Sequence, residues 1–234
     1  MLTKETRKLL KSVSGISSTA VIEYPITPIC PQDKSVIAFV DFSETEPEGF
    51  EKFGSYFLNE LLSVLDYFDD ANVELRDDVL YISGADGSCE YETTELSVIE
   101  GRNYVDPAKY QAMKNANSVM EFELSKDMMQ KVNKLSGLLK LNHIVIDFRG
   151  DNSEMVLTNF TEMDRYQNPT KLKIDAEITE HYAIVVDVRN FQTVPVDDYR
   201  ARIIKSPKGN LSILLMSQTK PIGIVVSLLE QFQA

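Results

Sequence analysis

The stretch LTKETRKLLKSVSGI, residues 2–16, decides the fold because LSKDMMQKVNKLSGL, residues 124–138, repeats its pattern. When the sequence is shifted by 122 positions, Leu2-Thr3-Lys4-Glu5 falls on Leu124-Ser125-Lys126-Asp127. After a short gap, Val21-Ile22-Glu23-Tyr24 corresponds to Val145-Ile146-Asp147-Phe148, so the similarity runs from a helix into the strand that follows it. The repeat predicts a chain built from two similar units.

Each copy of the repeat predicts an amphipathic helix. Thr3 and Ser125 are suited to the N-cap, and Glu5 and Asp127 lie in the first turn, where the helix dipole favours an acid. The predicted ends are Gly15 and Gly137. Helical spacing predicts a buried stripe of Thr6, Leu9, Leu10 and Val13 in the first helix and of Met128, Val132 and Leu135 in the second. The lysines then lie on the opposite sides, although solvated lysines on ordinary amphipathic helices would give the same pattern.

The rest of the chain predicts short strands and two further helices. The helices are expected at residues 56–68 and 188–194. The strands are expected at residues 19–23, 35–42, 73–76, 79–83, 88–93, 119–123, 142–148, 155–159, 171–176, 181–186, 199–204, 211–216 and 222–229. This order predicts an α+β fold with antiparallel sheets: an N-terminal domain at residues 1–94, a polar, irregular interdomain connector at 95–117, and a C-terminal domain at 118–234.

Composition excludes several classes of protein. Of the 234 residues 43% are hydrophobic, which excludes a disordered chain, and no apolar run approaches the roughly 20 residues that cross a bilayer. Residues 1–18 contain no apolar segment of a secretion signal, so an intracellular protein is expected. Cys30 and Cys89 are too few for a disulfide framework or a cysteine-based zinc site.

Charge is distributed unevenly along the chain. The 24 basic residues against 36 acidic ones give a net charge of −12, which by itself argues against a surface that coats nucleic acid. Positive charge is nevertheless concentrated on the two repeated segments. Those basic residues are Lys4, Arg7, Lys8 and Lys11 in the first copy and Lys126, Lys131, Lys134 and Lys140 in the second.

Sequence motifs of catalysis are absent. There is no Walker A sequence, nucleophile elbow, HExxH or paired CxxC, and His143 and His181 are expected to have structural or surface roles. The best enzymatic candidate is the acidic set Asp147, Asp151 and Glu154, which could bind magnesium if a hairpin gathered it, but Gly150-Asp151-Asn152 is also an ordinary hairpin turn. The chain is expected to be no enzyme, with no cofactor and no metal.

Several segments together resemble the DNA polymerase sliding clamps, most closely the T-even bacteriophage type. The resemblance spans essentially the whole chain. It is carried by Leu2-Thr3-Lys4-Glu5-Thr6 with Leu9-Leu10-Lys11, by Leu61-Leu62-Ser63-Val64 before Asp69-Asp70-Ala71, by Leu124-Ser125-Lys126-Asp127, and by the last strand at residues 221–229. The proline-containing residues 25–34 and the tail at residues 230–234 depart from the pattern.

The resemblance implies a non-catalytic processivity factor with the DNA clamp fold, in which each domain packs two helices on antiparallel sheets. Three copies would form a pseudo-six-fold ring that encircles duplex DNA without reading its sequence and tethers the replicative DNA polymerase. Further implied partners are an ATP-dependent clamp loader and transcription machinery, with no membrane, in the cytoplasm of a bacterial host if a phage encodes the chain. The implied DNA-facing residues are Lys4, Arg7, Lys8, Lys11, Lys126, Lys131, Lys134, Lys140 and Arg189.

The resemblance also implies two protein-binding surfaces. Candidates for binding partner tails beside the connector are Val98, Ile99, Tyr104, Val105, Pro221 and Leu229, each of which could equally be a core residue. Subunits are expected to join through sheet edges, with Glu90 and Glu92 of one copy facing Lys171 and Lys173 of the next. Two rival functions remain: an oligomeric scaffold that binds no DNA, and a metal-dependent hydrolase using Asp147, Asp151 and Glu154.

Overall fold

The computed structural model describes residues 2–45, 51–68, 71–85, 87–150, 153–159 and 167–233. The chain divides into two compact units: the first is Met1–Tyr110 with Lys220–Ile222, and the second is Gln111–Thr219 with Gly223–Ala234. The division falls inside the predicted connector. That connector is not irregular throughout, because it contains the short helices α3 (Leu96–Glu100) and α4 (Ala108–Lys114).

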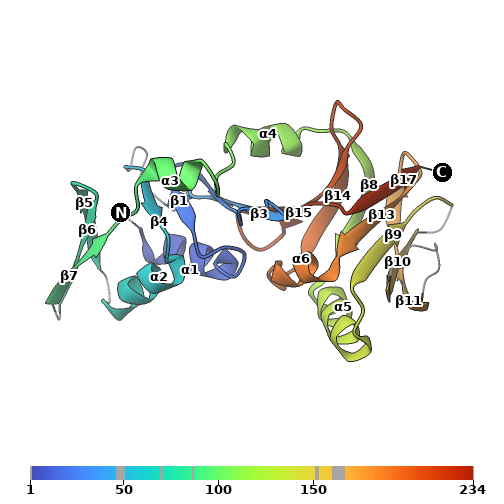
Figure 1. Cartoon of the computed structure of the whole chain (residues 1–234), viewed down its shortest axis with the longest axis horizontal. Helices are drawn as coiled ribbons and strands as arrows, with labels where there is room; N and C mark the ends of the chain where they lie inside the picture. The colour runs from blue at the N-terminus through green and yellow to red at the C-terminus, as the bar shows by residue number, and fades with distance from the viewer. Residues whose placement is uncertain are drawn as a thin grey trace. The chain divides into compact units, whose positions relative to one another are not determined.

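The first unit packs two helices beside three small groups of strands (Figure 1). Helices α1 (Lys4–Val13) and α2 (Leu58–Tyr67) lie against each other. Strand β1 (Ala20–Ile22) pairs with β4 (Phe53–Ser55), and β2 (Ile26–Ile29) pairs with β3 (Val36–Asp41). Strands β5 (Asn72–Arg76), β6 (Val79–Gly84) and β7 (Gly87–Glu92) form an antiparallel meander.

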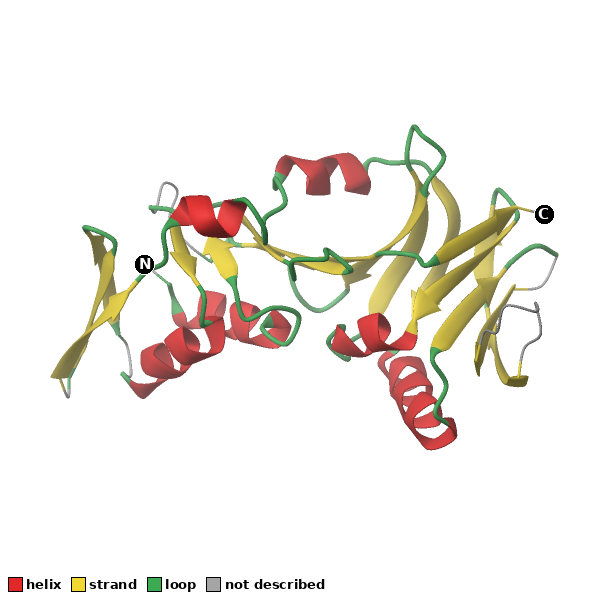
Figure 2. Ribbon diagram, viewed as in Figure 1, coloured by secondary structure: helices red, strands yellow, loops and turns green. Residues whose placement is uncertain are grey.

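The second unit has helices α5 (Lys126–Leu139) and α6 (Val188–Thr193) and two groups of antiparallel strands, which Figure 2 shows in yellow. One group runs β11-β10-β9-β13-β17, comprising Gln167–Ile174, Ser153–Asn159, His143–Asp147, Tyr182–Asp187 and Glu230–Gln233. The other includes β12-β8-β14-β15-β16, comprising Ala176–Ile178, Ser118–Leu124, Tyr199–Lys205, Leu211–Ser217 and Ile222–Val226. The predicted α+β class with antiparallel sheets is confirmed.

The first repeated helix forms as its sequence predicts. The Thr3 hydroxyl accepts a hydrogen bond from the Thr6 amide at 3.2 Å, which satisfies an amide that the first turn leaves without a backbone partner. The predicted stripe of Thr6, Leu9, Leu10 and Val13 is buried. Burial of this stripe fixes the rotation of α1 about its own axis.

The second repeated helix departs from its prediction in two respects. Ser125 caps it as expected by accepting from the Met128 amide at 3.2 Å, but Met129, Val132 and Ser136 are buried, while Met128 and Leu135 are half-buried. Gly137 does not end the helix. Lys140 caps it instead with a left-handed φ of 52°, because an internal glycine weakens a helix without stopping it.

Three strands escaped the sequence analysis. Prolines in residues 25–34 obscured β2, although Ile26, Thr27 and Ile29 are buried there. The short strand β4 pairs with β1, and the tail pairs as β17 with β13, with Phe232 opposite Ala183. In each case the partner strand is distant in the sequence, so pairing stabilises a segment whose local pattern is weak.

The two units have separate apolar interiors. Leu10, Phe39 and Leu61 are buried in the first unit, and Phe148 and Tyr199 in the second, where the Tyr199 hydroxyl donates to the Pro195 carbonyl at 2.8 Å. Cys30 and Cys89 are free thiols. None of the helices in the described part of the chain is both long enough and apolar enough to cross a membrane.

We predict opposite effects of alanine at two glycines. A Cβ at Gly54 in β4 would lie 2.6 Å from the Thr94 carbonyl oxygen, so Gly54→Ala should lower the free energy of unfolding by about 1–3 kcal/mol. Gly137 in α5 has no atom within 4 Å of such a Cβ, so Gly137→Ala should raise it by about 0.5–1 kcal/mol. Urea titration measures both changes, and a neutral Gly54→Ala would contradict the predicted clash.

Candidate nucleic-acid interface

Three lysines form a basic stripe on α1. Lys4, Lys8 and Lys11 are spaced four and three residues apart, so they share one face of the helix, and all three are exposed. Lys11 Nζ lies 2.7 Å from Asp66 Oδ2 on α2. The Asp66 carboxylate therefore compensates part of the charge at this end of the stripe. Sequence analysis missed Asp66 because it is far from Lys11 along the chain.

Arg7 corrects the predicted interface. Its side chain is only 6% exposed, and its Nη1 donates a hydrogen bond to the carbonyl of Leu65 in the last turn of α2. That carbonyl has no partner within its own helix, and a cation at a helix C-terminus is favourable. Arg7 therefore joins α1 to α2 and does not face DNA. Its position adjoins the buried Thr6, so the helix turns it inward.

The second unit also has exposed lysines on its repeated helix. Lys126, Lys131 and Lys134 are exposed on α5, with Lys131 and Lys134 one turn apart on the same face. Lys140 is exposed at the left-handed cap that ends the helix. These positions agree with outward-facing charge, and their contact with DNA stays a prediction.

Arg189 on α6 is exposed but locally neutralised. Its side chain is 87% exposed, while its Nη2 lies 2.6 Å and its Nε 3.1 Å from oxygens of Asp187. These hydrogen bonds hold the pKa of the Asp187 carboxyl below its usual value. The pair therefore adds little net positive charge to the surface around it.

The predicted partner-binding set is not uniformly exposed. Val98, Pro221 and Leu229 lie at the surface of their respective units, while Ile99 is fully buried and Val105 is nearly so. Ile99 contributes to the apolar interior beside Gly54, and its methyl group would meet any side chain placed at that glycine. Ile99 and Val105 are therefore core residues, which corrects the prediction that they could receive a partner.

Tyr104 is half-buried in a polar cluster at the connector. Lys52 Nζ lies 4.7 Å from the centre of the Tyr104 ring and 2.7 Å from Glu100 Oε1, and it also pairs with Glu23 at 3.3 Å. Burial raises the pKa of Tyr104 to about 12. The cluster attaches the connector to the first unit, which leaves Tyr104 less available to a partner than an isolated surface tyrosine.

The four residues of the predicted subunit contact lie on sheet edges. Glu90 and Glu92 are exposed on β7, an edge of the β5-β6-β7 meander. Lys171 and Lys173 are exposed on β11, the edge strand beside β10. Lys171 already pairs with Glu154 at 2.7 Å, so Lys173 is the better placed of the two lysines for a second chain. Contact between the two edges stays a prediction.

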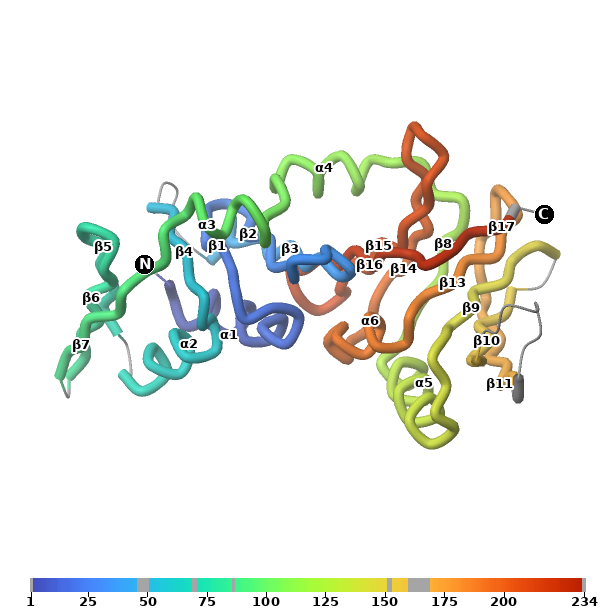
Figure 3. Tube along the Cα trace, in the orientation of Figure 1, coloured from blue at the N-terminus to red at the C-terminus, as the bar shows by residue number. Residues whose placement is uncertain are grey.

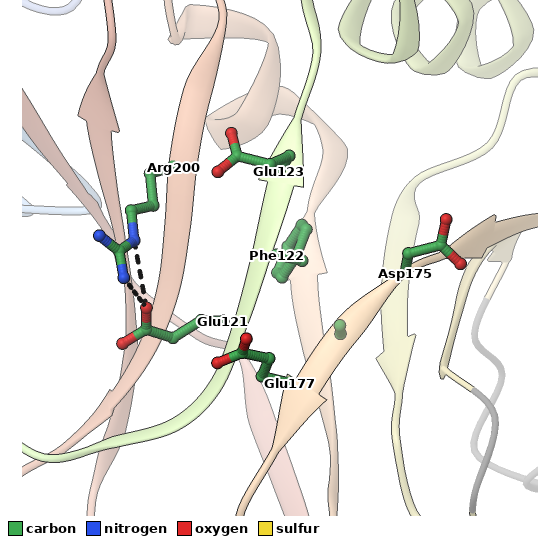
Figure 4. A pocket seen from close by; sticks show the side chains of 7 residues that line it. Glu121, Phe122, Glu123, Asp175, Glu177 and Arg200 are labelled. Atoms are coloured by element: carbon green, nitrogen blue, oxygen red, sulfur yellow. Dashed lines mark hydrogen bonds and ion pairs between the residues drawn. The ribbon is translucent and has the colours of Figure 1, made fainter.

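The second unit also has an acidic pocket on its sheet (Figure 4). Strand alternation places Glu121 and Glu123 on the face of β8 opposite its buried Met120 and Leu124. Arg200 Nη2 lies 2.6 Å from Glu121, and the remaining charged lining residues are Asp175 and Glu177. With four carboxylates against one guanidinium, this surface repels a phosphate backbone.

The acidic set of the hydrolase hypothesis is not assembled as a metal site. Asp147 receives bidentate hydrogen bonds from Arg149, which lower the pKa of its carboxyl, and Glu154 pairs with Lys171. Asp151 lies outside the described residues. Within the described ranges, no group of three or more His, Cys, Asp and Glu side chains is arranged to hold a metal ion. His181 Nδ1 lies 3.1 Å from the Phe148 carbonyl oxygen, a structural contact.

Comparisons with known proteins identify one kind of protein. The sliding clamp of Vibrio phage KVP40 is 27% identical over 162 residues, which are 67% of this chain and 69% of the relative. No protein-family model matches. Among solved structures, a putative DNA polymerase III β subunit from Eubacterium rectale superposes with a TM-score of 0.70 at 11% identity, covering 98% of this chain. This chain spans 64% of that subunit's length.

A third similarity covers both chains almost completely. The proliferating cellular nuclear antigen of Entamoeba histolytica has a TM-score of 0.63 at 10% identity, over 95% of this chain and 94% of that one. The fold of this chain is therefore the sliding-clamp fold, and the resemblance predicted from sequence is confirmed. Together the similarities support the predicted processivity function.

We predict that adjacent basic residues on α1 differ in their effect on stability. Arg7→Ala should lower the free energy of unfolding by about 1–3 kcal/mol, because it removes buried packing and leaves the Leu65 carbonyl without its donor. Lys8→Ala should change it by less than about 0.5 kcal/mol, because Lys8 is exposed. Chemical denaturation of the two variants measures the difference, and equal effects would place Arg7 at the surface.

Proposed function

We propose that this chain is a sliding clamp: three copies join head to tail in a ring that encircles duplex DNA and tethers a replicative DNA polymerase. The observation that carries the proposal is the repetition of exposed lysines on a capped helix in both units of a clamp fold. The ring performs no catalysis and uses no cofactor. Its role is topological, since an encircling protein leaves DNA only when the ring opens or the DNA ends.

Charge separation supports this arrangement. Each chain carries a net charge of −12, yet α1 and α5 present exposed lysines, while the pocket around Glu121 and Glu177 is acidic. A ring with the two helices facing its opening would attract the DNA backbone to the opening and repel it elsewhere. A head-to-tail interface closes into a ring when its rotation completes a circle.

Lysine contacts suit sliding. Contacts between lysine and phosphate are independent of base sequence, so movement along the duplex exchanges one contact for an equivalent one. Exposed, flexible lysine side chains keep these contacts weak at physiological salt. Retention on DNA then depends on encirclement, and it should survive salt that removes ordinary electrostatic binding.

Partners complete the proposed function. A polymerase tail would contact exposed apolar residues such as Val98, Pro221 and Leu229. Because the chain contains no nucleotide-binding motif, opening of the ring requires a separate ATP-dependent loader. Transcription machinery is a further candidate for the same docking surface. If a phage encodes the chain, as for its Vibrio phage relative, the ring acts in the cytoplasm of a bacterial host.

The first test measures retention on DNA. Changing Lys4, Lys8, Lys131 and Lys134 to Gln should slow loading about tenfold or more, because the opening loses its attraction for phosphate, while the trimer mass is unchanged. The matched control changes Lys34, Lys109, Lys114 and Lys208 to Gln, which removes equal charge from other exposed sites. The unaltered ring should remain on nicked circular DNA in high salt and leave linear DNA from its ends. Equal loss from both DNA forms would indicate a scaffold that does not encircle DNA.

The second test concerns the sheet edges. Changing Lys171 and Lys173 to Glu should weaken the trimer, because they would then face Glu90 and Glu92 of the next copy. Reversing all four charges should restore it, since opposite charges face each other again. Sedimentation velocity measures the assembly state. If both variants lose the trimer to the same degree, the two edges do not pair.

A further inference from the structure

The end of α5 exposes two large apolar side chains that its own unit does not cover. Leu138 is 69% exposed and Leu139 is 48% exposed. The repeat makes this exposure informative, because Ile16, which corresponds to Leu138, is only 7% exposed. Helix α1 ends at Val13, and the turn that follows folds Ile16 back onto the core, whereas α5 continues through Gly137 to Leu139. Figure 3 shows the chain turning from this end of α5 into β9.

The first unit has an apolar groove between α2 and β7. Its volume is about 370 Å³, and its lining residues are Glu60, Ser63, Val64, Tyr67, Phe68 and Cys89. Tyr67 is 78% exposed, although its ring makes an edge contact with Phe68 at 5.2 Å between centroids. Exposed apolar side chains gathered along a groove are typical of an interaction surface.

The charges around the two apolar features are complementary. Glu60 lines the groove, and Glu90 follows Cys89 on β7. Lys134 and Lys140 are exposed one turn before Leu138 and directly after Leu139. A docked pair of leucines would therefore bring basic side chains toward acidic ones. The same sign relation holds between the acidic β7 edge and the basic β11 edge.

The placement of the helices within each unit agrees with this match. In the first unit, the groove lies directly beside β7, the edge strand that bears Glu90 and Glu92. In the second unit, α5 packs against β10, the strand that pairs with the β11 edge. If β7 of one copy meets β11 of the next, each edge brings its helix toward the junction. The apolar features of both helices then meet beside the joined edges.

We propose that Leu138 and Leu139 of one copy dock into the α2–β7 groove of the next copy and form the apolar anchor of the subunit interface. This inference rests on the proposed ring and names the contact that holds it closed. The groove and the anchor are different surfaces of one chain, so the contact is head to tail and every copy both gives and receives an anchor. Burial of two leucines and a tyrosine supplies affinity that exposed ion pairs between sheet edges do not.

Cys89 makes the contact directly testable. It lines the groove, while Cys30 is buried, and burial raises the pKa of the Cys30 thiol to about 11. Leu138→Cys and Leu139→Cys would each place a thiol on the anchor. Diamide oxidises two thiols to a disulfide and is itself reduced to the hydrazine. We expect at least one of these variants to give covalent dimers and trimers under denaturing conditions, with no such bands when Cys89→Ser is added.

A matched control defines background crosslinking. Val196→Cys places a thiol on another partly exposed apolar residue of the second unit, at a position outside the anchor. It should give no covalent oligomers with diamide. Crosslinking of Val196→Cys at the same rate as the anchor variants would mean that collision explains the bands, and it would overturn the proposal.

A second measurement needs no chemistry. Leu138→Ser with Leu139→Ser should raise the dissociation constant of the trimer at least about tenfold, since two apolar side chains lose their burial. Both positions are exposed, so the variant should fold normally, and Val196→Ser should leave assembly unchanged. Sedimentation at a series of concentrations measures the constant.

The outcomes separate this inference from the proposed function. If the unaltered chain forms a trimer that stays on circular DNA, but the cysteine variants do not crosslink and the serine variant assembles normally, the anchor is overturned and the clamp function stands. If the serine variant keeps its trimer and loses only polymerase binding or DNA retention, the leucines contact that partner and the anchor is also overturned. An unaltered chain that is monomeric at all concentrations overturns the ring and the anchor together.

Discussion

The structure depends on burial of one side of each repeated helix. Thr6, Leu9, Leu10 and Val13 are buried in α1, and Met129 and Val132 are buried in α5. A helix that is fixed by its apolar side has no freedom to choose which side faces solvent. The lysines therefore point outward as a consequence of core packing, and hydrophobic burial supplies the orientation that a DNA-facing surface requires.

Local sequence predicts those parts of the fold in which neighbouring residues decide the outcome. Thr3 and Ser125 cap their helices as expected because a cap bonds to an amide only three residues away. Arg7 could not be placed in this way, since its partner is the Leu65 carbonyl on another helix. The same reason explains the strands at residues 26–29 and 230–233, which are stabilised by partners distant in sequence. The repeat predicted the class of fold because it is a property of the whole chain.

The candidate site was predictable in its charges and less so in its contacts. Lys4, Lys8 and Lys134 are exposed as helical spacing indicates. Ile99 and Val105 are buried, and no pattern of sequence separates an apolar residue that waits for a partner from one that completes a core. Asp66 and Arg200 reach their ion pairs across elements, so their effect on the local charge appears only in three dimensions.

The difference between the two repeated helices shows how duplicated units can acquire separate roles. Both copies contain the Ser-Gly pair that follows the apolar stripe, yet α1 ends before it and α5 passes through it. The extra turn moves Leu138 away from the interior that holds Ile16. A head-to-tail ring needs this kind of asymmetry, because each chain must present two unlike surfaces that fit each other. Two identical units would offer like surfaces, so a change at the end of one helix is enough to distinguish the head of the chain from its tail.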